Sequence, residues 1–255
     1  MPVALVTIPF SHYCEKARWA LDRAQIRHEE RAWLPLLHTL PAMRAGGGRG
    51  SSTPVLVTPH GSIQDSTEIL RWVDRQLAEP DRLFPEGPSR AEVERLEERF
   101  DVALGPAARR WGYFHLLDDR ERLLRMMSIG VPAWQTAAFR AGLPAIRPLM
   151  KRGLGVTPEK SARALTRVEE VFAEVTALLA DGRRYLTGDR FTAADLAFAA
   201  LATPVTFPPE HEQHFPSLAD VPPAARPAVE RLRESPAGRF ALRLYREERA
   251  ATVKR

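Results

Sequence analysis

Residues 7–22 read TIPFSHYCEKARWALD, and this stretch decides how the rest of the chain is interpreted. A short apolar run at 3–8, VALVTI, leads into it and is typical of a buried β-strand. Ser11 then stands where the N-cap of a helix is expected, because its side-chain oxygen can accept a hydrogen bond from an amide of the first turn. We therefore predict a helix from Ser11 to about Ala24, with Cys14 in its first turn.

Cys14 is open to two interpretations. Helix N-termini stabilise thiolates, which makes the residue a candidate nucleophile. Its position shares a helix face with Ala17, Leu21 and Ala24, however, and we therefore favour a small, buried hydrophobic side chain. Because it is the only cysteine of the chain, an internal disulfide and a metal site built on several thiolates are both excluded. We expect no bound metal.

The composition is that of a globular protein. Hydrophobic residues make up 44% of the 255 residues and charged residues 27%, and no apolar run approaches the roughly 20 residues that span a bilayer. The net charge of +5 comes from arginines interleaved with acids, as in RAEVERLEERFD, a pattern that usually marks solvated helix faces. The first residues also lack the features of a signal peptide. We expect a cytoplasmic protein that binds neither membranes nor nucleic acid.

The chain divides into three segments. Residues 1–78 read as β-α-β-loop-β-β-α, with a last helix that begins at Asp65. Residues 79–88, EPDRLFPEGP, carry three prolines and a glycine and are interpreted as a linker. From residue 89 to 255 the pattern is helical throughout. The expected strands are 3–8, 28–33, 54–57 and 62–64.

Two helical segments of the last part are distinctive. LTGDRFTAADLAFAALATPV, at 186–205, predicts a buried helix whose start is capped by Thr192 and Asp195, with Phe191 and Leu196 as a hydrophobic staple. The stretch 129–156 is interrupted by three prolines, and it predicts either short helices or a kinked pair.

Two further segments carry polar groups at the ends of strands and helices. Thr53-Pro54-Val55 follows a glycine-rich loop, and the proline predicts a strand end, an edge or a bend, with a cis peptide bond as one possibility. Asp65 and Ser66 open the next helix, where an acid and a hydroxyl can cap the helix or bind the charged groups of a ligand.

Taken in order, these motifs resemble the cytosolic glutathione S-transferases, of the serine- or cysteine-containing, bacterial-like kind. The resemblance rests on the strand, the S-x-x-C helix start at Ser11, T-P-V-L from Thr53, D-S-T-E-I-L from Asp65, and the buried-helix segment at 186–205. It implies a thioredoxin-like α/β domain that binds glutathione, followed by an all-α domain. It also implies a homodimer and a role in detoxification.

The resemblance implies roles for individual residues. Thr53, Pro54 and Val55 would contact the peptide backbone of the cosubstrate glutathione, and Asp65 and Ser66 would hold the ammonium and α-carboxylate of its γ-glutamyl end.

Ser11 occupies the position that the family uses for catalysis. Its hydroxyl would donate a hydrogen bond to the glutathione sulfur and favour the thiolate, which then attacks a small electrophile. The residue that holds the glycine carboxylate of glutathione stays open, and the candidates are His38, Arg44 and Arg49.

The second substrate is expected between the two domains. Aromatic side chains and a histidine are candidate walls of its pocket, and Arg109 and Arg110 either steer an anionic substrate or are simply exposed. The candidate wall residues are Phe10, His12, Trp111, Tyr113 and Phe114.

Three functions remain open at this stage. The first is a glutathione transferase that uses Ser11. The second is a glutathione-dependent reductase or peroxidase that uses Cys14, since a lone thiol can still exchange with a disulfide. The third is a protein that keeps the fold as a binding module or scaffold without catalysis, because a fold alone does not fix a function.

Overall fold

Four short strands form one mixed sheet in the computed structural model, which describes residues 2–79 and 81–250. The spatial order is β2-β1-β3-β4, in which β1 is parallel to β2 and antiparallel to β3, and β3 is antiparallel to β4. β1 is buried along its whole length, as its uninterrupted apolar run predicts. The strands are β1 (Ala4–Thr7), β2 (Glu29–Ala32), β3 (Val55–Thr58) and β4 (Gly61–Gln64).

Three helices accompany the sheet: α1 (His12–Arg23), α2 (Thr39–Ala45) and α3 (Ser66–Asp74). α1 and α3 follow the prediction, but α2 lies in a segment interpreted as loop. Its N-cap residue, His38, makes no capping hydrogen bond, and its first turn holds no acid. The sequence signals that normally mark a helix start are therefore missing from α2.

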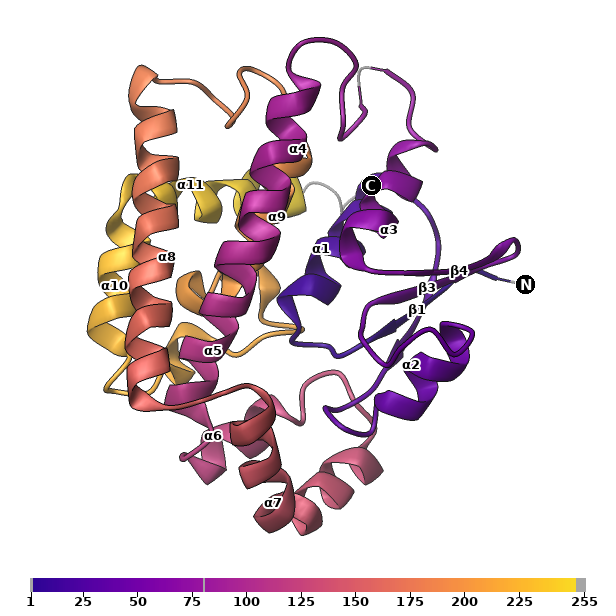
Figure 1. Cartoon of the computed structure of the whole chain (residues 1–255), viewed down its shortest axis with the longest axis vertical. Coiled ribbons are helices and arrows are strands. Elements are labelled where there is room, and N and C mark those ends of the chain that lie inside the picture. Colours follow the sequence, from indigo (N-terminus) through magenta and orange to yellow (C-terminus); the bar gives the residue numbers. More distant parts are fainter. Residues whose placement is uncertain (1, 80, 251–255) are drawn as a thin grey trace.

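The part of residues 81–250 that forms regular structure is helical and lies beside the sheet domain (Figure 1). A five-residue π-helical segment, Phe100–Leu104, joins α4 to α5. These elements confirm the predicted fold class, an α/β domain followed by an all-α domain. The helices are α4 (Arg90–Arg99), α5 (Gly105–Leu116), α6 (Arg120–Met126), α7 (Ala133–Gly153), α8 (Pro158–Leu178), α9 (Ala193–Thr206), α10 (Arg226–Glu234) and α11 (Pro236–Leu244).

The proline-interrupted segment forms one helix, α7, instead of a set of short helices. Pro144 and Pro148 lie inside it, four residues apart, and both are exposed. Each proline removes one amide donor from the helix. Because both prolines are on a solvated face, water can satisfy the carbonyls that lose their partners, and the helix continues.

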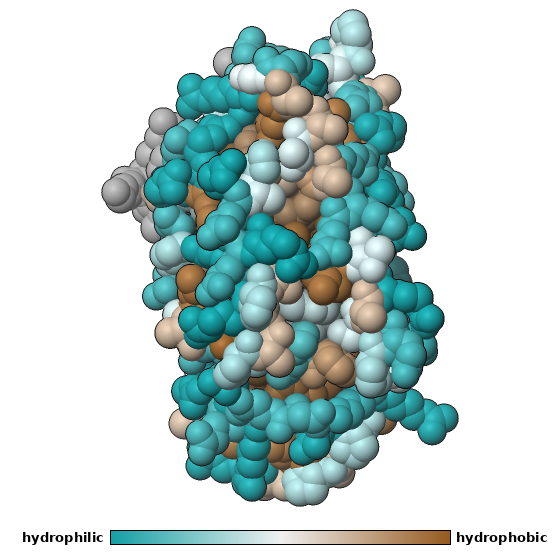
Figure 2. Space-filling view, turned by 90° about the vertical axis from the view of Figure 1, so that its left-hand side faces the viewer, coloured by the Kyte–Doolittle hydropathy of each residue, from teal (hydrophilic) through white to brown (hydrophobic). Residues whose placement is uncertain are grey.

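The buried centre of the helical domain is α9, every residue of which is buried. The predicted capping box is present: Asp195 Oδ2 accepts a hydrogen bond from the Thr192 amide, 2.8 Å away. The core that surrounds α9 continues through α1 into the sheet, so a single cluster of buried side chains crosses from one domain to the other. On the side of α8, α10 and α11, hydrophilic residues cover most of the surface (Figure 2).

Buried charges also join the domains along α1. The Lys16 ammonium lies 2.5 Å from Asp101 and also pairs with Glu97, at the junction of α4 and the π segment. On the same helix, the buried Glu15 carboxylate pairs with Arg249, 2.8 Å away, near the end of the described chain. His211 lies 3.5 Å from the same carboxylate.

Candidate active site

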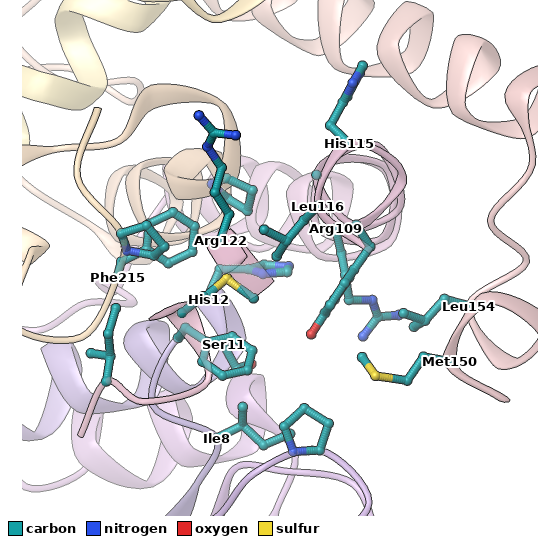
Figure 3. Close-up of a pocket in the computed structure, with 18 of the residues that line it drawn as sticks. Ile8, Ser11, His12, Arg109, His115, Leu116, Arg122, Met150, Leu154 and Phe215 are labelled. Atoms are coloured by element: carbon teal, nitrogen blue, oxygen red, sulfur yellow. The ribbon is translucent and has the colours of Figure 1, made fainter. Parts of the chain in front are cut away.

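A cavity of about 860 Å³ lies where the turn between β1 and α1 faces the helical domain (Figure 3). One wall comes from the sheet domain and includes Ser11, His38 and Thr53. The opposite walls come from α5, α6, the end of α7 and the stretch 207–229, and they are mostly apolar. A cavity of this size, mostly apolar with several polar and charged groups in its walls, has the form of a small-molecule site.

Ser11 is the N-cap of α1 and lines the cavity. Its Oγ accepts a hydrogen bond from the Cys14 amide at 3.4 Å. A serine hydroxyl has one proton to donate in addition to the lone pairs that accept. The same hydroxyl also interacts with the Cys14 thiol. Because a hydroxyl rotates, its proton can turn from that thiol to a ligand in the cavity.

Cys14 lies just behind Ser11 and is completely buried. Its Sγ accepts a hydrogen bond from the Ile8 amide at 3.5 Å, and burial raises the pKa of the thiol. A thiol in this state is neutral and inaccessible at neutral pH, so the prediction that Cys14 packs in the core is confirmed.

Thr53, Pro54 and Val55 differ in their access to the cavity. The Thr53–Pro54 peptide bond is cis. Thr53 lines the cavity, whereas Pro54 and Val55 are buried and are not among its lining residues. Strand pairing begins at Val55, which is opposite Gln64. The backbone of Thr53 therefore lies outside the described sheet ladder.

Asp65 and Ser66 are at the start of α3 and are not part of the cavity lining. Asp65 is exposed, and its carboxylate accepts hydrogen bonds from the amides of Thr67 at 2.8 Å and Glu68 at 3.2 Å. Ser66 is buried. The carboxylate of Asp65 thus caps its own helix, and an exposed carboxylate of this kind still has lone pairs for a cation.

The three residues that were candidates to bind the glycine end of glutathione lie in different places. His38 lines the cavity together with Thr53. Arg49 points elsewhere, because its guanidinium donates to the carbonyls of Gly46 and Ser62. Arg44 is exposed and lies outside the cavity lining. Burial lowers the pKa of His38, so its imidazole is neutral at neutral pH and offers an N–H donor rather than a charge.

Most of the expected pocket walls line the cavity. The exception is Phe114, which lies outside the lining, whereas Phe10, His12, Trp111 and Tyr113 are part of it. The α5 residues follow helical spacing: Arg109, Gly112, Tyr113 and Leu116 lie on one face.

His12 and Tyr13 attach the start of α1 to the helical domain. His12 Nε2 lies 3.1 Å from the Gly105 carbonyl, and because a carbonyl only accepts, this nitrogen carries the proton. The Tyr13 hydroxyl donates to the Asp101 carbonyl at 2.8 Å. Burial and the nearby Arg109 charge lower the pKa of His12 to about 3, so its imidazole is neutral.

Several wall residues were missed by the sequence interpretation. Met150 and Leu154, at the end of α7, and Phe215 belong to the lining and are labelled in Figure 3. Nothing local marks them, because an apolar residue on a cavity wall has the same sequence pattern as one in the core. Only the path of the chain after α6 brings them to Ser11.

Within residues 2–79 and 81–250, no group of three or more His, Cys, Asp or Glu side chains is arranged to hold a metal ion. The same part of the chain contains no helix with the length and apolar character needed to cross a membrane.

Two family models match the chain. The model described as glutathione S-transferase, N-terminal domain, matches residues 5–81, and the model for the C-terminal domain matches residues 158–234. The chain belongs to the glutathione S-transferase family. The helices α4 to α7, within residues 82–157, lie between the two matches.

Solved structures of this family share the fold at low sequence identity. A glutathione S-transferase from Methylobacterium radiotolerans, in complex with glutathione sulfonate, is 20% identical over 95% of each chain, with a TM-score of 0.55. One from Methylobacillus flagellatus with glutathione bound is 18% identical over 94% of this chain and 98% of that one, with a TM-score of 0.55. One from Rhodospirillum rubrum is 22% identical over 94% and 91%, with a TM-score of 0.55. No protein with a curated description matches the chain.

Proposed function

We propose that the chain is a glutathione transferase in which Ser11 stabilises the thiolate of bound glutathione, and that it acts on small electrophiles in the cytoplasm, as a homodimer, in detoxification. One observation carries this proposal: the Ser11 hydroxyl lines the same cavity as Thr53, beside a large apolar space. Two of the related structures contain glutathione or its sulfonate.

The cosubstrate would lie along the sheet-domain wall. The backbone of Thr53, which precedes the cis proline and the first paired residue of β3, offers an amide and a carbonyl to an extended peptide. Pro54 and Val55 hold that backbone in place. The γ-glutamyl end would extend to Asp65 and Ser66 at the N-terminus of α3, where the Ser66 hydroxyl and the positive end of the helix dipole favour a carboxylate and Asp65 favours an ammonium.

The glycine carboxylate of glutathione would meet His38. This histidine shares the cavity with Thr53, and its neutral imidazole can donate one hydrogen bond to the carboxylate.

The chemistry follows from a sulfur placed beside Ser11. A hydrogen bond from the hydroxyl favours the charged form of the thiol, which lowers the pKa of the thiol and raises the fraction of thiolate at neutral pH. The thiolate then attacks an electrophilic carbon of a second substrate in the apolar part of the cavity. Ser11 itself forms no covalent bond. A mechanism that uses Cys14 is disfavoured, since the thiol is buried and its pKa is raised.

The test compares Ser11→Ala with Ser128→Ala. Ser128 also lines the cavity, but its hydroxyl is committed to the Leu124 carbonyl, 2.7 Å away, which makes it a matched control. We expect Ser11→Ala to lower kcat/KM for an aryl halide by about 10- to 100-fold and Ser128→Ala to change it less than about twofold. The absorbance of the bound thiolate at different pH values should show a higher pKa of glutathione in Ser11→Ala.

Calorimetry with glutathione tests the binding part separately. Asp65→Asn removes the charge proposed to hold the ammonium and keeps an oxygen that can cap α3. We expect weaker binding in Asp65→Asn and in Ser66→Ala. Glutathione binding without turnover of any electrophile would indicate a binding module, and no binding to the wild type would refute the proposal.

A further inference from the structure

We propose that Arg109 determines the specificity of the second-substrate cavity, and that this cavity takes apolar or aromatic electrophiles that carry an anionic group. The inference rests on the proposed function, because it assigns a substrate class to the same site. It depends on three observations: the position of Arg109 on a cavity wall, the absence of an acidic partner for it in the described chain, and the apolar surroundings of its charge.

The first observation is the position of Arg109. It lies on the face of α5 that also places Tyr113 and Leu116 in the cavity lining. Figure 3 shows its side chain on the wall where Met150 and Leu154 of α7 lie. The adjacent Arg110 is outside the lining, and its Nε donates to the Leu154 carbonyl at 3.2 Å. Of these two neighbouring arginines, Arg109 is the one that a ligand in the cavity would meet.

The second observation is the missing counter-ion. Two other arginines of the lining have acidic partners: Arg122 pairs with Asp119, and Arg125 with Asp220 at 3.4 Å. Over residues 2–79 and 81–250, no carboxylate forms an ion pair with Arg109, and no hydrogen bond of its guanidinium is present. A guanidinium in this state has its whole set of donors available for a ligand.

The third observation is what surrounds the charge. The Tyr13 ring centroid lies 6.0 Å from the guanidinium carbon of Arg109, and the cavity that Arg109 lines also has the apolar side chains of Met150 and Leu154 in its walls. Arg109 itself is exposed, as one of the two alternatives from the sequence predicted. A ligand that fills the cavity covers its charge and displaces water from these walls, and an ion pair shielded in this way is screened less than one left at an open surface. The positive charge of Arg109 also lowers the pKa of His12, the residue next to Ser11.

Together these features favour one ligand chemistry. Carboxylate and sulfonate oxygens match the planar donors of a guanidinium, while the apolar walls require a hydrophobic body. Of the described residues that line the cavity, Asp220 is the only acid, and Arg125 already pairs with it. An apolar cation would therefore find no free carboxylate on these walls.

The test uses 4-chloro-3-nitrobenzoate and its methyl ester with glutathione. In both reactions a bond forms between the glutathione sulfur and the ring carbon, chloride leaves with the pair of electrons of the C–Cl bond, and the thiol proton goes to solvent. In Arg109→Gln we expect kcat/KM for the carboxylate to fall about tenfold and that for the ester to change less than about twofold. Arg109→Lys, which keeps the charge, should retain most of the preference.

A control variant separates the local effect from the loss of net charge. Arg140 is exposed on α7, outside the cavity lining, so Arg140→Gln removes the same charge at a distance. We expect it to leave both substrates unchanged. Equal losses for acid and ester in Arg109→Gln, or no loss for either, would overturn the inference.

A binding experiment keeps this inference distinct from the proposed function. 8-Anilinonaphthalene-1-sulfonate and N-phenyl-1-naphthylamine share one skeleton, and only the first carries a sulfonate. Arg109→Gln should weaken binding of the sulfonate about tenfold, followed by its fluorescence, and leave the neutral compound unchanged. If neither chlorinated compound is conjugated, the fluorescent pair alone decides whether the cavity selects anions, and the transferase proposal is decided separately by glutathione binding and by other electrophiles. Unchanged binding of the sulfonate would refute the role of Arg109.

Discussion

Tyr13 of α1 donates its hydroxyl proton to the Asp101 carbonyl oxygen, 2.8 Å away in the π-helical segment of the other domain. The bond fixes the helix that Ser11 caps against the helical domain. A π-helical segment inserted in a helix changes the direction of its carbonyls, and such segments are frequent at functional sites. The position of Ser11 therefore depends on a contact between the two domains.

Gly105→Ala tests this contact. A Cβ at Gly105 would lie 2.3 Å from the Tyr13 hydroxyl oxygen and 2.7 Å from the ring carbon that bears it, so Tyr13 must move. We expect a loss of about 1–3 kcal/mol in the free energy of unfolding, and a fall in kcat/KM, because the start of α1 shifts with Tyr13. Urea unfolding and steady-state kinetics measure the two effects.

Gly112→Ala is the matched control on the same helix. Its new Cβ would meet Pro204 at an ordinary 3.8 Å, so we expect unchanged or slightly higher stability, as for any helical Gly→Ala change. Equal stability of the two variants would show that the Tyr13 contact is dispensable.

Gln135 provides a second link, between α7 and the sheet domain. Its Oε1 accepts from the Leu34 amide at 2.9 Å, and its Nε2 donates to the Ala32 carbonyl at 3.0 Å. Gln135→Leu leaves both backbone groups without this partner, and we expect a loss of about 2 kcal/mol in unfolding free energy. The KM for the second substrate should also rise, because α7 forms one wall of the cavity.

The control for this prediction is Gln76→Leu. Gln76 is exposed at the end of the sheet domain, where its loss should cost less than about 0.5 kcal/mol. A Gln135→Leu variant with wild-type stability and KM would refute the role of α7 docking.

The Cys14 thiol should resist modification in the native protein. It is completely buried and its pKa is raised, so the thiolate that reacts with a disulfide reagent is scarce and shielded. With 5,5′-dithiobis(2-nitrobenzoate) we expect a rate at least about a hundredfold lower for the native protein than for the protein in guanidinium chloride. Since the chain has one cysteine, the signal reports Cys14 alone. Rapid native labelling, or loss of transferase activity in Cys14→Ala, would restore a role in catalysis.

Stability should fall between pH 7 and pH 5 because two imidazoles are buried in the neutral form. Burial lowers the pKa values of His12 and His211 from 6.5 to about 3. A histidine with a lowered pKa contributes stability that is fully present above pH 6.5 and is lost as the pH falls toward 3. At pH 5 this loss is about 2 kcal/mol for each of the two histidines.

One buried acid acts in the opposite direction. Burial raises the pKa of Asp195 from 3.8 to about 6, so its contribution is larger at low pH and offsets part of the loss. Thermal unfolding at pH 7 and pH 5 measures the net change. His211→Asn should make the decrease in Tm smaller, whereas His60→Asn, at an exposed turn, should not. A Tm that does not fall between these pH values would contradict the prediction.

The sequence could predict the parts of the fold that depend on local chemistry. Ser11 caps α1 and the pair Thr192 and Asp195 caps α9, since a side-chain oxygen next to orphan amides acts over a few residues. The spacing of apolar residues predicted the strands and most of the long helices, because it too is a local pattern within a short segment. α2 was missed because His38 provides no cap. The segment of α7 was predicted to form short helices or a kinked pair, because the exposure of Pro144 and Pro148, which lets one helix continue through both, is not visible in the sequence.

The candidate site was predictable only in part, because its walls meet through tertiary contacts. Local signals indicated Ser11 and Thr53, which lie at the ends of elements, but they carried no information on Gln135 or Met150. Arg109 and Arg110 show the limit most clearly: they are identical and adjacent in sequence. The packing of α5 on α8 and α9 places the first in the cavity lining and the second against the Leu154 carbonyl. Residue type and order set the charge, whereas the packing of distant helices decided which charge a ligand can reach.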